Sequence, residues 1–207
     1  MRMRCIAWKA IATLTFAGSM MNGCSGRAAP TGNAVAVIAR LQQGIPGVAP
    51  LVGSWPRGSL AGRYTSESER LRQRVGGFLD GADLYLFRDR RFVYVEWADI
   101  LPKTICASGH WSFHDQMVEL STDRVLCKSF TTKLEPRYVA FSLTDSAGRS
   151  LRLMGTSRQL RAFEDSAARD DLELLMNSLE AVELYATTEE SRRAFEDVRR
   201  AFRQGDA

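Results

Sequence analysis

The sequence has few of the residues on which most catalytic and metal sites depend. Its 207 residues include only two histidines, which excludes any metal or catalytic scheme that needs three. The chain has no Walker loop, no Gly-x-Gly-x-x-Gly stretch and no Gly-x-Ser-x-Gly elbow, motifs that are typical of nucleotide-binding proteins and many hydrolases. We therefore predict that the protein is not an enzyme and that it binds no cofactor or metal.

Long apolar runs are also missing, since no stretch approaches the roughly 18 apolar residues of a membrane-spanning helix. The start of the chain does carry a shorter run. Three cations precede apolar residues 10–18, and no acidic residue occurs before Cys24. A cationic start followed by a short apolar segment is typical of a signal peptide, which we predict over residues 1–23.

The end of this leader resembles the cleavage box of bacterial lipoproteins, in which a cysteine becomes the acylated first residue. Small Gly23 precedes Cys24, while Met21 and Asn22 stand where such boxes usually carry Leu and then Ala or Ser. The resemblance implies a lipid anchor on Cys24 and a place in the cell envelope, at the periplasmic face of a bacterial membrane. The alternative is an ordinary secretory signal cut near residues 34–36, which gives a soluble secreted or periplasmic protein.

The formal charge of +4 suggests nucleic acid or an anionic membrane as a partner. Removal of the leader takes away three of the 28 cations and none of the 24 acids, which leaves a charge of +1. Because the basic character belongs mostly to the leader, we predict no nucleic-acid partner.

Residues 24–59 contain prolines and glycines at short intervals, which predicts a flexible tether. One or two helical turns fit within residues 33–43. Apolar residues of this tether, such as Ile38, Leu41 and Val48, are candidates to dock on the domain that follows.

Residues 60–155 change to short runs of β-branched and aromatic residues separated by turn signals. The runs are 84–87, 92–97, 109–113, 117–121, 124–130, 138–143 and 150–155. Strands at hairpin spacing predict an antiparallel meander. Such meanders usually close or half-close, because closure removes exposed edges.

Part of this region resembles small bacterial envelope proteins with lipocalin-like (calycin) barrels. The matching residues are Leu60-Ala61-Gly62-Arg63-Tyr64, Leu84-x-Leu86-Phe87-x-Asp89-x-x-Phe92, Gly109-His110-Trp111 and Val118-Glu119-Leu120, with Arg90 in place of the usual turn glycine. The resemblance covers about residues 60–125 and implies a barrel or half-barrel, but no catalytic residue.

After Gly155, apolar residues recur at spacings of three and four, which predicts one or two helices within residues 156–207 that pack on the barrel. Thr187 and Glu190 have the spacing of a capping box, and the alternating run 180–185 leaves a strand open. The predicted fold class is therefore mainly β with C-terminal helices (α+β).

Cys106 and Cys127 are predicted to form a disulfide, because unassigned cysteines usually pair in an oxidising compartment. Closing a loop of about 20 residues should stabilise the fold by about 3 kcal/mol. The bond would hold a loop over residues 98–108 against a later strand.

Isolated polar residues of this region are weak candidates for a site. His110 and His114 would lie ~13 Å apart on one strand face, too far to share a metal. We expect both histidines to be exposed on a hairpin. Glu96 lies between Val95 and Trp97, and we expect it to point outward.

The ligand-binding candidates are six aromatic residues: Tyr85, Phe87, Tyr94, Trp97, Trp111 and Phe113. A small barrel either fills its interior with such side chains or leaves room for one apolar ligand. The leading hypothesis is a non-enzymatic envelope lipoprotein that binds a small apolar ligand or an envelope protein. The alternative is a structural or inhibitory interaction protein that has no ligand cavity and uses the loop 98–108.

Overall fold

The structure is a computed structural model that describes residues 33–51, 60–127 and 133–204. The leader, Cys24 and parts of the predicted tether lie outside these ranges. The helices are α1 (Ala34–Gly44), α2 (Glu69–Val75), α3 (Arg158–Asp165), α4 (Asp171–Met176) and α5 (Thr188–Ala201). The strands are β1 (Val48–Pro50), β2 (Gly62–Thr65), β3 (Asp80–Leu86), β4 (Arg91–Ala98), β5 (Leu101–His114), β6 (Met117–Val125), β7 (Arg137–Asp145), β8 (Gly148–Gly155), β9 (Leu179–Leu184) and β10 (Arg203–Gln204).

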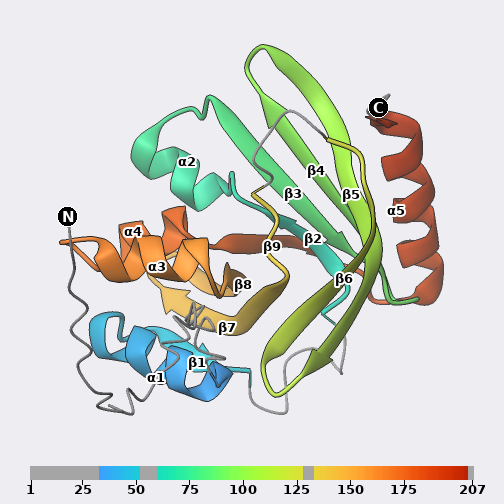
Figure 1. Cartoon of the computed structure of the whole chain (residues 1–207). Coiled ribbons are helices and arrows are strands. Elements are labelled where there is room, and N and C mark those ends of the chain that lie inside the picture. The colour runs from blue at the N-terminus through green and yellow to red at the C-terminus, as the bar shows by residue number, and fades with distance from the viewer. Residues whose placement is uncertain (1–32, 52–59, 128–132, 205–207) are drawn as a thin grey trace, which may run out of the picture. The chain divides into compact units, whose positions relative to one another are not determined.

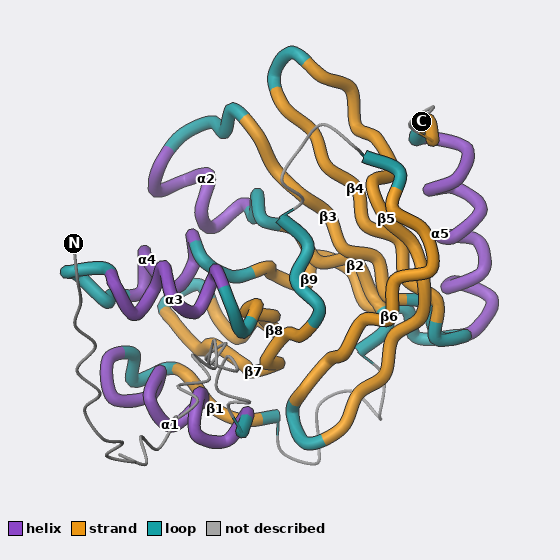
Figure 2. Tube along the Cα trace, viewed as in Figure 1, coloured by secondary structure: helices purple, strands orange, loops and turns teal. Residues whose placement is uncertain are grey.

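The strands form one sheet, with the helices around it (Figure 2). Neighbouring strands follow the order β1-β7-β6-β5-β4-β3-β2-β9-β8, and β8 pairs in turn with β7. The pairings from β7 round to β8 therefore return to their starting point and give the sheet a ring-like course (Figure 1). Every pair in this ring is antiparallel, so the predicted antiparallel α+β fold is confirmed.

Two joins in the ring are short. β6 pairs with β7 through residues 117–119, and β8 pairs with β9 through Arg152 and Leu153. β6 pairs with only the first residues of β7, and β1 pairs with β7 further along, at residues 141–143. At the other end of β6, β10 pairs in parallel with residues 104–105 of β5. The sheet therefore continues past both ends of β6 with short strands from the two ends of the described chain.

Tight turns between consecutive strands account for the hairpins. In the β5–β6 turn, Asp115 and Gln116 both have positive φ, at 47° and 66°, which suits the twist of antiparallel strands. In the β3–β4 turn, Arg90 adopts a φ of 69°, the conformation that the usual glycine supplies. The Arg90 guanidinium lies 4.6 Å from the centroid of the Trp111 ring, a contact that glycine cannot make.

The sheet buries side chains on both faces where helices cover it. On β7, Tyr138 and Ala140 belong to one core cluster, whereas Val139 and Phe141 belong to a second cluster with residues of α1, α3 and α4. This alternation is that of a strand buried on two sides. Figure 1 shows α1, α3 and α4 grouped near β7 and β8, and α5 beside β5.

Part of the predicted tether forms regular structure. α1 begins after Asn33, whose side chain accepts a hydrogen bond from the Val35 N–H, and it buries Val37, Ile38 and Leu41. β1 follows directly and pairs with β7. The expected docking of Ile38 and Leu41 is confirmed, and the helical turns predicted within residues 33–43 belong to the 11-residue helix α1, which is longer than the one or two turns expected.

The C-terminal segment contains α3, α4 and α5, and also the strand that the alternating run left open. This strand, β9, lies between β2 and β8. The predicted capping box opens α5, because the Thr187 side chain accepts from the Glu190 N–H and the Glu190 carboxylate accepts from the Thr187 N–H. None of the helices within the described ranges has the length and hydropathy that a bilayer crossing requires.

Candidate functional site

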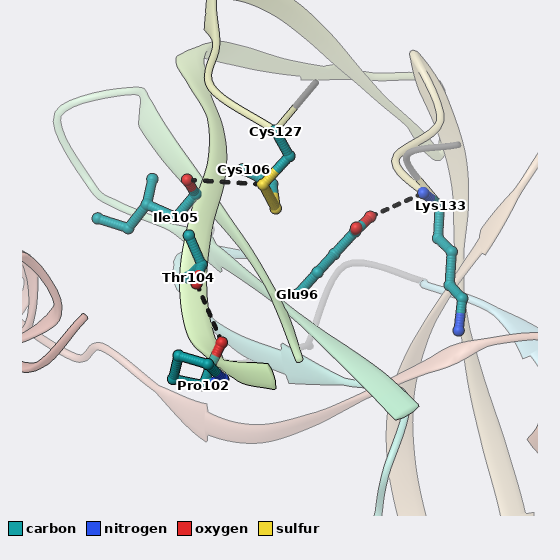
Figure 3. Close-up of a disulfide and its surroundings, with 7 residues drawn as sticks. All are labelled: Glu96, Pro102, Thr104, Ile105, Cys106, Cys127 and Lys133. Carbon is teal, nitrogen blue, oxygen red and sulfur yellow. Dashed lines mark hydrogen bonds between the residues drawn. A yellow bond between two sulfur atoms is a disulfide. The ribbon is translucent and has the colours of Figure 1, made fainter. Parts of the chain in front are cut away.

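The disulfide that the sequence predicts joins β5 to the residues that follow β6 (Figure 3). The Cα atoms of Cys106 and Cys127 lie 4.7 Å apart. The Cys106 carbonyl also accepts hydrogen bonds from the N–H groups of Leu126 and Cys127. The bond therefore fixes the end of β6 against the middle of β5.

The prediction of a loop over residues 98–108 is wrong, because these residues form the end of the β4–β5 hairpin. Ala98 pairs with Leu101, so the turn is confined to Asp99 and Ile100. Polar residues after the turn conceal the strand in the sequence, whereas pairing with β4 supplies its backbone hydrogen bonds.

Three exposed apolar side chains lie at this end of the hairpin, and we call them the hairpin tip: Leu79, Ile100 and Leu101. Ile100 is 90% exposed, Leu79 76% and Leu101 39%. The Leu79 carbonyl accepts a hydrogen bond from the Asp99 N–H at 2.7 Å, which holds the start of β3 against the β4–β5 turn. Grouped exposed apolar residues are typical of contact surfaces.

Lys133 braces the hairpin close to its turn. Its ammonium pairs with Asp80 at 2.6 Å, and its backbone N–H donates to Glu96 Oε1 at 2.8 Å. Figure 3 shows Glu96 directed from β4 toward Lys133, beside the disulfide. The expectation that Glu96 points outward is therefore wrong. It shares a face with buried Tyr94, and the opposite face, with Val95, is buried as well.

The six aromatic candidates are divided between two faces of the sheet. Tyr85 and Phe87 stack with their ring centroids 6.3 Å apart, and Phe87 meets Phe195 of α5 edge-on at 5.1 Å. Tyr94 pairs across the ladder with Leu84, the neighbour of Tyr85, so it lies on the opposite face. These residues therefore do not line one common space.

The remaining aromatic candidates are packed or exposed individually. Trp111 is buried, and its Nε1 donates to the Phe87 carbonyl at 2.9 Å. The Trp97 ring lies directly against Gly81 of β3, where a Cβ would collide with it. Phe113 is exposed near the β5–β6 turn.

All five tyrosines of the chain are buried: Tyr64, Tyr85, Tyr94, Tyr138 and Tyr185. Loss of solvation raises the pKa of each of these hydroxyls, and it raises the pKa of Tyr85 to about 12. All five therefore stay neutral at physiological pH and act as packing groups, and the Tyr64 and Tyr138 hydroxyls also form hydrogen bonds with the backbone.

Both histidines are exposed, as predicted. His110 Nδ1 lies 2.9 Å from Asp123, and His114 Nε2 lies 3.8 Å from Glu119. Within the described ranges, no three His, Cys, Asp or Glu side chains gather as metal ligands do.

A buried ion pair lies across the short β8–β9 join. Arg152 Nη1 donates to Glu180 at 2.8 Å, and Nε donates to the Ser178 hydroxyl at 2.8 Å. Nη2 donates to the Leu175 and Ser178 carbonyls. Burial is the largest influence on Arg152 and lowers its pKa to about 10, which leaves the guanidinium charged at neutral pH. The group therefore serves the fold rather than a ligand.

Comparison of the chain with protein-family models, with curated proteins and with solved structures gives no match. The function must therefore be inferred from the residues and geometry of the chain itself.

Proposed function

We propose that the protein is a non-enzymatic envelope lipoprotein, anchored through Cys24, that binds an envelope protein through the hairpin tip. The observation that carries this proposal is the group of exposed apolar side chains at the end of a braced hairpin. The small apolar ligand, the other candidate from the sequence, has less support because Tyr85, Phe87 and Tyr94 are buried on two different faces.

The proposed location in the cell envelope is supported by the leader and by the cysteines. The cationic start, the short apolar run and Gly23-Cys24 follow the order of an exported lipoprotein. The Cys106–Cys127 bond suits an oxidising compartment such as the envelope.

The proposed fold is a lipocalin-like barrel with α5 packed on its wall. Two observations support it: the ring-like course of the pairings and the position of the resemblance residues on β2 to β6. In such a fold the loops and hairpin ends usually contain the binding residues, because the side chains of the wall strands pack in the core.

The tip is suited to a protein partner with an apolar pocket. Ile100 projects from a two-residue turn whose backbone is already fixed, so binding costs little ordering entropy. Exposed Asp99 lies directly beside Ile100 and favours cations at the rim of that pocket.

The test is a photo-crosslinking amino acid placed at Ile100 of the full chain in the cells that produce it. We expect one discrete protein adduct, which the second change Leu79→Ser should reduce about tenfold if the tip is an interaction hot spot. The matched control places the crosslinker at Met176 of α4, another exposed apolar residue, where no such adduct should form.

Adducts of equal yield at positions 100 and 176, or a lipid adduct alone at position 100, would contradict a protein partner. Ile100→Ser should change the free energy of unfolding by less than about 0.5 kcal/mol, because the side chain is exposed. A larger loss would give the tip a structural role instead.

A further inference from the structure

A second group of residues lies on the face of β3 that α5 covers, and we call it the Asp83 cluster: Asp83, Arg63, Lys103 and Trp97. Only 1% of the Asp83 side chain is exposed. Its Oδ2 accepts hydrogen bonds from Arg63 Nη2 and from Lys103 Nζ, each at 3.2 Å. One buried carboxylate oxygen therefore holds two cations side by side.

Aromatic rings border both cations. The Arg63 guanidinium lies 5.9 Å from the centroid of the Tyr85 ring. Lys103 Nζ lies 5.6 Å from the Trp97 ring centroid and 5.9 Å from that of Phe202, just beyond α5. Such contacts position a cation without consuming its N–H donors.

The hydrogen bonding of the cluster is incomplete. Asp83 Oδ1, Arg63 Nε and Trp97 Nε1 are buried and have no hydrogen-bond partner within the described chain. Two of these three atoms are donors. Meanwhile the Arg63 side chain is 34% exposed and that of Lys103 is 38% exposed, so both cations can be reached from solvent.

The balance of charge favours a particular kind of ligand. Two cations are paired with the one buried carboxylate, which leaves one positive charge in excess among the paired groups, and the exposed carboxylate of Glu183, opposite Arg63 in the β2–β9 pairing, offsets part of it. A monoanion neutralises this excess, whereas a dianion would also meet repulsion from Asp83. The rings of Trp97 and Phe202 beside Lys103 offer apolar contact to the rest of the ligand.

We propose that the Asp83 cluster binds a small carboxylate with an aromatic or apolar body. The carboxylate accepts hydrogen bonds from the partly exposed Lys103 ammonium and Arg63 guanidinium, and the body lies against Trp97 and Phe202. Asp83 positions the two cations. This site goes beyond the proposed function, because no residue of the hairpin tip takes part in it.

The test titrates the full chain with phenylacetate, with its neutral analogue phenylacetamide and with acetate. Calorimetry gives the affinity, and the ¹H–¹⁵N resonance of the Trp97 indole, assigned with Trp97→Phe, reports the location. We expect phenylacetate to shift this resonance and to bind about tenfold more tightly than either of the other probes. The reason is that phenylacetamide lacks the negative charge and acetate lacks the phenyl ring.

Variants separate the site from a general charge effect. Lys103→Gln should weaken phenylacetate binding about tenfold, while Lys133→Gln, a lysine of similar exposure paired with Asp80, should leave it within about twofold. Arg63→Lys keeps the charge but loses the planar guanidinium, and it should also weaken binding. Thermal unfolding of each variant verifies that it is folded.

The proposal is overturned if phenylacetate leaves the Trp97 indole resonance unmoved, or if phenylacetamide or acetate binds as tightly as phenylacetate. Equal losses in Lys103→Gln and Lys133→Gln overturn it as well, since they indicate a diffuse charge effect. The crosslinking experiment at Ile100 is independent of all these outcomes, so failure of one proposal leaves the other standing.

Discussion

Two of the buried charged groups in the described part of the chain, Arg152 and Asp83, differ in how completely their hydrogen bonds are made. Around Arg152, each guanidinium nitrogen has a partner, and the side chain is sealed from solvent between β8, β9 and α4. Around Asp83, one carboxylate oxygen has two hydrogen-bond partners and the other has none among the residues that the structure describes, and the two cations are partly exposed. The hydrogen bonds of the Arg152 centre are therefore complete, whereas the Asp83 centre retains hydrogen-bonding groups that are not used.

This difference separates a structural charge from a candidate binding group. A saturated network has nothing left to offer a ligand, and any substitution removes interactions that the fold needs. An unsaturated network that solvent can reach has donors to spare, and it gains from a ligand that accepts from them. Burial of a charge does not distinguish the two cases, but the state of its hydrogen bonds does.

The largest effect should follow from Arg152→Met. The change leaves the Leu175 and Ser178 carbonyls unpaired in the core and weakens the contact between β8 and β9. We expect the free energy of unfolding, measured in urea, to fall by about 3–5 kcal/mol.

The control for this experiment is Arg193→Met on the exposed face of α5, which should cost less than about 0.5 kcal/mol. A loss below about 1 kcal/mol in Arg152→Met would mean that the saturated centre is not structural, and the contrast with Asp83 would fail.

A smaller effect should follow from removal of the disulfide. Replacement of Cys106 and Cys127 by Ser should lower the free energy of unfolding by about 3 kcal/mol in the loop-entropy account. Because Lys103 precedes Cys106 on β5, the same change should also weaken phenylacetate binding, whereas the Arg152 centre lies on other strands. If reduced and oxidised wild-type protein bind phenylacetate equally, the disulfide does not support the Asp83 cluster.

The smallest effect concerns alkaline pH and Tyr85, which borders the Asp83 cluster. Burial raises the pKa of Tyr85 to about 12 in the folded protein, against about 10 in the unfolded chain. The stability from this neutral hydroxyl is complete below pH ~10 and is lost as the pH rises toward 12, by about 1.4 kcal/mol at pH ~11.

Tyr85→Phe should therefore lose about 1.4 kcal/mol less than the wild type between pH ~8 and ~11, as measured by urea unfolding at each pH. Absorbance at 295 nm should show Tyr85 ionising in the folded wild type only near pH 12. Identical pH profiles for the two proteins would show that Tyr85 is not shielded from solvent.

The sequence predicts the hairpins well, because their signals are local. The aromatic run 92–97, the turn before it and the alternation in 109–113 each determine their own strand. The capping box at Thr187 and the disulfide are local or paired signals of the same kind. The position of α1 is predicted by the turns expected within residues 33–43, but its full length is not, because the surrounding glycines and prolines outweigh its single apolar stripe at Val37, Ile38 and Leu41.

The Asp83 cluster could not be found from the sequence, because its members come from four separate strands. One signal was available: Asp83 lies between apolar Ala82 and Leu84 in a strand, where a lone carboxylate needs cationic partners. Orientation was also undetermined. Alternation along β4 places Glu96 and Trp97 on opposite faces of the strand. The sequence does not show that α5 packs on one of these faces, so it does not show that both faces are buried.

The late position of β9 in the chain has a consequence for how the protein is made. Residues 179–184 lie between β2 and β8, so the circuit of strand pairings cannot be completed until these residues have been synthesised, long after β2. Until then β2 and β8 present open edges, which are the usual starting points of misassembly. A newly synthesised chain should therefore depend on a holding chaperone until residues 179–184 become available.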